Sequence, residues 1–184
     1  MAPGEIKYKT RYRGIKYPRL EFKTGSLELI LPYNYKPEVL VSKHRQWIDR
    51  KTRFIKACLK DSKNKKIIKR SMDEFRSLAK LLAMDSAGEL RVKINGVFFR
   101  PMKTKWASFS KKRNLTLNTL MKFLPERLIK YIIYHEVTHL LERHHNENFW
   151  KVISKKYPDY PRYEKSLFSY WFRLHNSKME KLTE

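Results

Sequence analysis

The chain has 184 residues, of which 41% are hydrophobic and 14% aromatic, so it can bury a core and is not a disordered basic tail. Lys and Arg number 42 against 18 Asp and Glu, a formal net charge of +24. This charge attracts polyanions such as nucleic acid, nucleotides or an anionic membrane face. It fits a merely Lys-rich surface as well, and it does not define a function by itself.

Cysteine content and hydropathy argue against a protein with an internal disulfide and against a secreted or membrane-spanning protein. The single cysteine, Cys58, cannot form a disulfide within the chain, which fits a reducing compartment. The opening residues lack the apolar segment of a signal peptide, and no apolar run is long enough to span a membrane. We therefore expect a cytoplasmic protein.

The first third of the chain predicts three strands and one helix. The strand segments are EIKYKTRY, IKYPRLEF and GSLELILPY, which are rich in Ile, Tyr, Phe and Leu and are broken by Gly or Pro. Residues 36–60 then carry apolar side chains at helical spacing with Pro37 in the first turn, which predicts a single helix.

A second helix is expected after a Lys-rich loop. Ser71 and Glu74 have the spacing of a capping box, which predicts a helix that begins there and runs to about Met84. Gly88 is expected to stop this helix.

Short strands follow. Residues 90–100 alternate in polarity around Asn95 and Gly96, a pattern that predicts a hairpin. The segments TKWASFS and NLTLN predict two more strands on either side of the turn SKKRN.

The last third of the chain predicts helices. Pro125 begins a long helix that is expected to continue to about Glu142, and Asn146 is a candidate cap for the next one. Residues 162–176 predict the last helix. The order of elements indicates an α+β fold, with an N-terminal β-rich subdomain over residues 1–70 and a catalytic domain over residues 71–184.

His135, Glu136 and His139 form the motif H-E-x-x-H on the long predicted helix. Residues four apart lie about 6 Å from each other along one helix face, so both imidazoles can reach one metal ion. Zn²⁺ accepts imidazole nitrogen, and Glu136 lies to the side, where it can take a proton from a zinc-bound water. The alternative is a pair of core histidines bonded to carbonyl groups.

A third ligand is needed for such a zinc site. In a continuous helix His145 would point about 240° away from His139, so the chain must leave the helix first. A turn near Arg143 and His144 could bring the His145 ring back, and we prefer this residue. His144, Glu147 and Glu164 are the alternatives.

The segments KWASFSKKRNLTLN, FLPERLIKYIIY and HEVTHLLERHHNENFW resemble the YgjP-like metal-dependent hydrolases. These are related to the SprT-like and other minimal zincin metallopeptidases. The segment LELILPYNYKPEVLVSKHRQWIDRK also resembles the family, so the likeness covers most of the chain. It implies a zincin-like catalytic half with a zinc site formed by His135, His139 and His145, and Glu136 as the catalytic base.

The sequence departs from the family pattern beside this site. Ala107 and Phe109 replace the family's Gly and Cys, Lys105 replaces its Arg, and Asn146 replaces its Ser. The residues of the metal set are intact. The wall around KWASFS is altered, which suggests a different choice of substrate.

Trp106 and Ser108 are candidate substrate-binding residues. An edge strand beside the cleft of a zincin-like fold can pair with an extended peptide through main-chain hydrogen bonds. Trp106 fits an ordinary place in the core equally well.

The leading hypothesis is a zinc-dependent metallopeptidase, in which zinc polarises the peptide carbonyl and Glu136 activates the attacking water. One alternative is a metal-dependent hydrolase of an anionic substrate such as a nucleotide. Another is a nucleic-acid-associated protease, because basic clusters could bind nucleic acid without sequence specificity.

Overall fold

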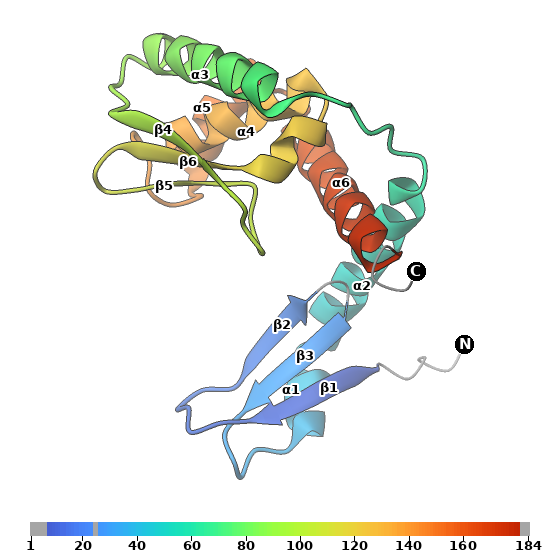
Figure 1. The fold of residues 1–184 in the computed structure, drawn as a ribbon. Helices are drawn as coiled ribbons and strands as arrows, with labels where there is room; N and C mark the ends of the chain where they lie inside the picture. The colour runs from blue at the N-terminus through green and yellow to red at the C-terminus, as the bar shows by residue number, and fades with distance from the viewer. Residues whose placement is uncertain (1–6, 24–25, 181–184) are drawn as a thin grey trace. The chain divides into compact units, whose positions relative to one another are not determined.

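The computed structural model describes residues 7–23 and 26–180. The fold is α+β, as predicted from the sequence, and the chain divides into two compact units, Met1–Asn64 and Lys65–Glu184 (Figure 1). Among the described helices, none is both long enough and apolar enough to cross a membrane.

The N-terminal unit contains β1 (Tyr8–Tyr12), β2 (Arg19–Lys23), β3 (Ser26–Leu31), α1 (Pro37–Lys43) and α2 (Arg45–Ser62). The C-terminal unit contains α3 (Met72–Glu89), β4 (Gly96–Arg100), β5 (Ala107–Phe109), β6 (Asn114–Asn118), the 3-10 helix η1 (Thr119–Phe123), α4 (Glu126–Thr138), α5 (Glu147–Lys156) and α6 (Tyr160–Glu180).

The N-terminal unit is built around β3, which lies between β1 and β2. β1 runs parallel to β3 and β2 runs antiparallel to it. Alternate β3 residues, Leu27, Leu29 and Leu31, are buried and pack with Leu40 of α1 and Ile48 of α2. The three strands that the sequence predicts are therefore present, and their apolar face is covered by the following helices.

The single helix predicted over residues 36–60 is wrong, because the structure has two helices there. His44 separates α1 from α2 and has φ −113° and ψ 16°, outside the helical region. Its backbone N–H still donates to Leu40 and its carbonyl still accepts from Ile48. Both neighbouring turns thus keep their hydrogen bonds, and the apolar spacing runs through the break.

In the C-terminal unit a second three-stranded sheet supports the helices. Its strand order is β4-β6-β5, with β4 parallel and β5 antiparallel to β6. The central strand contributes Leu115 and Leu117 to the core, where Phe75 of α3 and Ile129 of α4 are also fully buried. Because α4 packs against both α3 and β5, one side of this helix lies beside an edge strand.

The hairpin predicted around Asn95 and Gly96 is wrong. β4 begins at Gly96 and pairs in parallel with β6, not with the residues that precede it. The backbone N–H of Asn95 donates to the carbonyl of Arg113 at 2.8 Å, and its side chain donates to the carbonyl of Lys112 at 2.9 Å. These two bonds attach Asn95 to the β5–β6 turn in place of a hairpin partner.

The capping box at the start of α3 is confirmed, since Ser71 accepts from the Glu74 backbone and Glu74 accepts from the Ser71 backbone. The predicted end of the helix is wrong, because α3 continues through Gly88 to Glu89. Arg91, with φ 54°, takes the left-handed conformation in which a helix commonly ends.

Asn118 fixes the connection that leads into β5. This residue is fully buried at the end of β6, and its side-chain amide donates to the carbonyls of Met102 and Lys105, each at 2.9 Å. Its side-chain oxygen accepts from the backbone N–H of Leu120 at 3.1 Å. One side chain therefore holds the β4–β5 connection against the start of η1.

Replacing Asn118 with Ala is expected to lower the free energy of unfolding by about 3 kcal/mol, because three hydrogen bonds at about 1 kcal/mol each are lost from a buried site. Urea unfolding measures this change. Asn148→Ala removes the same side chain from an exposed position on α5 and should change stability by less than about 0.5 kcal/mol. Equal stability of the two variants would contradict the assignment.

Candidate functional site

α4 carries the H-E-x-x-H motif at its C-terminal end. The helix is anchored by buried apolar side chains, among them Leu128 and Ile132, and His135 continues their face. The predicted continuation to Glu142 is wrong, because α4 ends at Thr138 and His139 is its C-cap. The last turn tightens: the N–H groups of residues 139, 140 and 141 each donate to the carbonyl three residues earlier.

The segment between His139 and Asn146 reverses the chain and is held by Asn146. The side-chain oxygen of Asn146 accepts from the backbone of Phe149 at 2.9 Å, so the predicted cap of α5 is confirmed. Its amide nitrogen donates to the Glu142 carboxylate at 3.1 Å, and its backbone donates to His144 at 2.8 Å. Asn146 is thus bonded to residues that come before His145 and to one that comes after it. These bonds hold the backbone at His145 in place.

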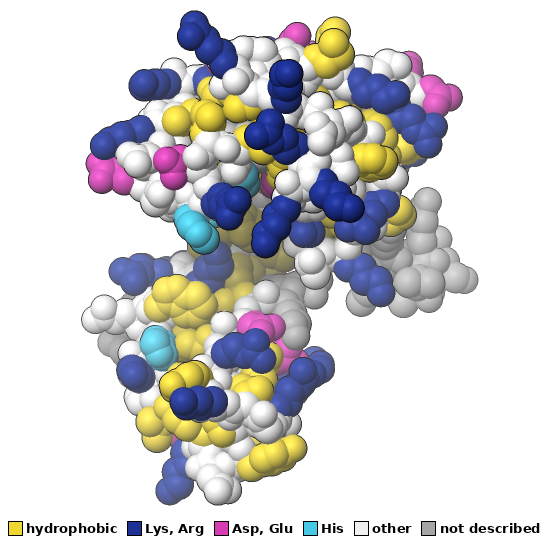
Figure 2. Space-filling view, turned by 90° about the vertical axis from the view of Figure 1, so that its left-hand side faces the viewer, with side chains coloured by type: hydrophobic (Ala, Val, Ile, Leu, Met, Phe, Trp, Pro, Cys, Tyr) yellow, Lys and Arg dark blue, Asp and Glu magenta, His cyan; other side chains and the backbone are white. Residues whose placement is uncertain are grey.

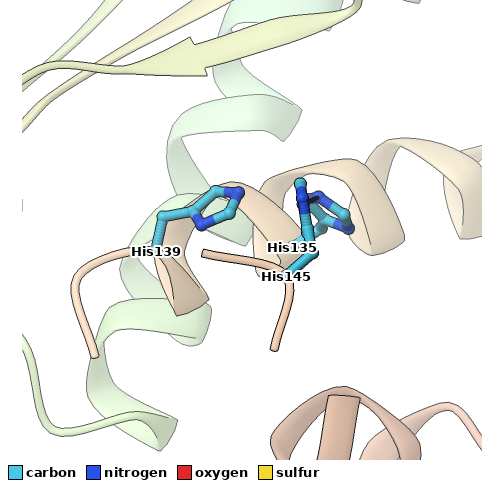
Figure 3. Close-up of side chains that lie close together, drawn as sticks. All are labelled: His135, His139 and His145. Carbon is cyan, nitrogen blue, oxygen red and sulfur yellow. Dashed lines mark hydrogen bonds between the residues drawn. The ribbon is translucent and has the colours of Figure 1, made fainter. Parts of the chain in front are cut away.

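The rings of His135, His139 and His145 come together at this reversal (Figure 3). One nitrogen of each ring lies within 4.8 Å of the others, and the Nε2 atoms of His135 and His145 are 2.9 Å apart. His135 and His139 are half-buried, while His145 is exposed. The cluster therefore has a solvent-facing side, which an incoming substrate can approach.

Two aromatic residues of α5 support the cluster. Phe149 is fully buried, and its ring centroid lies 4.9 Å from that of His135 and 4.7 Å from those of His139 and His145. Trp150 stacks on His145 at 5.6 Å. The three imidazoles therefore pack against the same apolar side chains, which restrict how far each ring can tilt.

The Nδ1 atoms of His139 and His135 lie near oxygen atoms. Nδ1 of His139 lies 3.0 Å from the carbonyl of Glu142, which favours a proton on Nδ1 and leaves Nε2 free to bind a metal. Nδ1 of His135 is buried and lies 3.7 Å from Oε1 of Glu164. Tyr131, one helical turn before His135, donates its hydroxyl to the same oxygen at 2.5 Å.

Burial favours the neutral form of His135 and of His145. It lowers the pKa of His135 to about 3, with the neighbouring His145 and His139 adding to the effect. Burial also lowers the pKa of His145, followed by the influence of His139 and His144. Neutral imidazole is the form that binds a metal ion, so at neutral pH neither His135 nor His145 needs to lose a proton first.

Glu136 is half-buried and faces β5 instead of the bulk solvent. Burial raises the pKa of its carboxyl group to about 7, while the positive charge of Lys105 and a hydrogen bond from the backbone N–H of Phe109 act in the opposite direction. A carboxyl group with a pKa near neutrality is well suited to exchange protons with water at neutral pH.

The two candidate substrate-binding residues lie at β5. Trp106 immediately precedes the strand, and its ring packs edge-on against Trp171 of α6 with the centroids 4.9 Å apart. Ser108 lies in the middle of β5, opposite Thr116 of β6. Trp106 thus has a packing role in the core, which leaves its part in substrate binding a prediction.

Two residues of the site were not identified as such from the sequence. Tyr131 lies four residues before His135, so helical spacing could have placed the two on one face. Glu164 was considered only as a metal ligand. Phe149 and Trp150, by contrast, were expected from the sequence to pack against the segment that carries His145, and their rings do contact His145. No local pattern links Glu164 to His135, because α6 begins more than twenty residues later in the chain.

Comparisons with known proteins find a matching family and similar solved structures. The model of the YgjP-like, metallopeptidase domain family matches residues 59–170. No curated protein matches the chain. A similar solved structure is the crystal structure of the metallopeptidase zymogen of Pyrococcus abyssi abylysin, with 25% identity and a TM-score of 0.42, covering 58% of this chain and 96% of that chain. Another is the corresponding structure of Methanocaldococcus jannaschii jannalysin, with 26% identity, a TM-score of 0.41, and 54% and 90% coverage.

The family match extends from the end of α2 into α6 and includes the whole histidine cluster, Glu136 and the sheet beside them. It covers more than half of the chain. The chain therefore belongs to the YgjP-like metallopeptidase family.

Proposed function

We propose that this protein is a zinc-dependent peptidase in which His135, His139 and His145 bind one Zn²⁺ ion and Glu136 acts as the general base. The observation that carries the proposal is the convergence of three imidazoles beside a buried carboxyl group in a metallopeptidase fold. Family membership favours a peptide substrate over a nucleotide.

The chemistry of the three side chains fits zinc. Imidazole nitrogen is a preferred zinc ligand, and sites with three protein ligands leave a position for water or substrate. The Nε2 atoms of His135 and His145, 2.9 Å apart, can share a proton in a hydrogen bond or, when both are unprotonated, face one cation together. Zinc bound there would make a water molecule more acidic and polarise a carbonyl group.

Glu136 supplies the proton transfers in this proposal. Its carboxylate accepts a proton from the attacking water and then donates that proton to the amine leaving group. The hydrogen bond from the Phe109 backbone holds the carboxyl group in place and favours its ionised form. Lys105 acts in the same direction through its charge.

The free edge of β5 offers a place for the substrate backbone. The Trp106 carbonyl accepts from Asn118 and the Ser110 N–H donates to Asn114, so these residues face β6. In an antiparallel pair the intervening positions alternate, which turns the backbone groups of Ala107 and Phe109 away from β6. The Phe109 N–H is already bonded to Glu136, so an extended peptide would pair with the N–H and C=O of Ala107 and the C=O of Phe109, next to Glu136.

Substitutions at two neighbouring histidines test which residue is the third ligand. His145→Ala is expected to lower the affinity for Zn²⁺ by at least about 100-fold, because one of three direct ligands is lost. His144→Ala removes an exposed imidazole one position earlier and should change the affinity by less than about threefold. Competition with a chromogenic chelator measures both, and the reverse order of effects would contradict the assignment.

Glu164 is expected to orient His135 without binding the metal itself. Glu164→Gln keeps the shape of the side chain but removes its charge, so the affinity for Zn²⁺ should fall by about tenfold. Glu147→Gln, on an exposed acid of α5 that pairs with Lys151, is the matched control and should leave the affinity unchanged. A loss above about 100-fold at Glu164 would instead identify a direct ligand.

Glu136→Gln is expected to lower kcat for peptide hydrolysis by about 1000-fold, because general base catalysis typically contributes 10²–10⁴-fold. The variant should still bind one Zn²⁺ per chain, which metal analysis of the purified protein measures. Unstructured peptides with a fluorophore and a quencher report hydrolysis. Wild-type turnover in a zinc-loaded Glu136→Gln variant would refute the mechanism.

A further inference from the structure

The sheet beside the site is strongly basic. Residues 90–125, which form β4, β5, β6 and η1, contain no Asp or Glu. They contain nine basic residues, namely Arg91, Lys93, Arg100, Lys103, Lys105, Lys111, Lys112, Arg113 and Lys122. Because all the charged side chains of this sheet region are positive, they produce a local positive potential that attracts an anionic ligand.

These charges are not neutralised within the protein. Eight of the nine side chains are exposed, and within this fully described stretch none forms an ion pair. Among the acids at the site, Glu136 interacts with one of these charges, that of Lys105. The other acids at the site are engaged elsewhere. Glu142 accepts from Asn146, Glu147 pairs with Lys151, and Glu164 accepts from Tyr131. In Figure 2 the Lys and Arg side chains, in dark blue, are spread over the face of this unit and are more widespread than the Asp and Glu side chains, in magenta.

Five of the basic residues flank the edge strand. Lys103 and Lys105 precede β5, while Lys111, Lys112 and Arg113 form the turn that follows it. Hydrogen bonds hold both flanks in place. The Asn118 amide binds the carbonyl of Lys105, and Asn95 binds those of Lys112 and Arg113. The positive charges are therefore attached to a fixed backbone at both ends of the proposed peptide-binding edge.

We propose that the site selects acidic peptides. An extended peptide paired with the edge of β5 places Asp or Glu side chains near Lys103 and Lys105 at one end and near the basic turn at the other. Lys111 lies six positions after Lys105, a span of at most about 20 Å, so the preferred acids lie about six positions apart. This specificity rests on the proposed peptidase function.

A peptide fits this surface better than nucleic acid does. Proteins that bind single strands present several aromatic side chains on which successive bases stack. Within residues 90–125 Phe98 is the one large apolar side chain that is exposed. The charges lie at the two ends of a strand edge, an arrangement that matches spaced carboxylates on a paired backbone.

The test compares three peptide series on the zinc-loaded full chain. The peptides share a neutral centre and carry Glu, Gln or Lys at two positions six residues apart. We expect kcat/KM for the Glu series to exceed that for the Gln series by at least about tenfold, and the difference to shrink as salt rises. Cleavage of all three series at equal rates would overturn the specificity and leave the peptidase function standing.

Charge reversal locates the effect. Lys111→Glu combined with Lys112→Glu should remove most of the preference for Glu peptides. The control combines Lys80→Glu on α3 with Lys155→Glu on α5, two exposed positions that give the same net charge, and should retain the preference. Equal loss in both double variants would show that only the overall charge matters and would overturn the proposal.

Equilibrium binding separates the two hypotheses. Labelled Glu peptide should bind Glu136→Gln protein more tightly than Gln peptide does, by about tenfold, even if no peptide is cleaved. Absence of cleavage with this binding intact would refute the peptidase and support acidic recognition. The same assay includes a single-stranded DNA oligonucleotide. If the oligonucleotide binds more tightly than the Glu peptide, and if the Lys111/Lys112 double variant loses binding of both to the same extent, the surface is a nucleic-acid surface and the inference is overturned.

Discussion

The arrangement of the site depends on a single chain reversal between His139 and Asn146. Two histidines four residues apart on a helix cannot enclose a metal ion without a third ligand from elsewhere. Because α4 ends at Thr138 and α5 begins at Glu147, the short segment between them carries His145 back over the other two rings. Asn146 holds this segment through its side chain and its backbone.

The site has two electrostatically different parts, a buried part around the histidines and an exposed basic part on the neighbouring sheet. Phe149 and the neighbouring aromatic rings pack against the histidines, and burial lowers the pKa of His135 and raises that of Glu136. Beside them the sheet carries exposed, unpaired positive charge. Lys105 belongs to both, because it lies at the entry to β5 and its charge favours the ionised form of Glu136.

Local sequence patterns predicted many of the elements. The strands of the N-terminal unit, the capping box of Ser71 and Glu74, and the cap of α5 at Asn146 are confirmed, because each depends on neighbouring residues. The pattern at Asn95 and Gly96 misled, since hydrogen bonds to the distant β5–β6 turn override the local preference for a hairpin. The end of α3 was misplaced because Arg91 adopts the conformation expected of glycine.

The histidine cluster was accessible to prediction through the motif and the family resemblance. The contact of Glu164 with His135 was not, since Glu164 comes from a helix that begins later in the chain and meets His135 only in three dimensions. The division of the chain near residue 70 and the roles of Glu136, His135, His139, His145, Trp106 and Ser108 stay predictions.

X-ray absorption spectroscopy of the zinc-loaded full chain tests the central claim most directly, because it counts the ligands of the bound metal. The account predicts one zinc ion with three imidazole nitrogens at about 2.0–2.1 Å and a further light ligand from solvent. A spectrum with only two imidazoles, or with no position left for solvent, would contradict it.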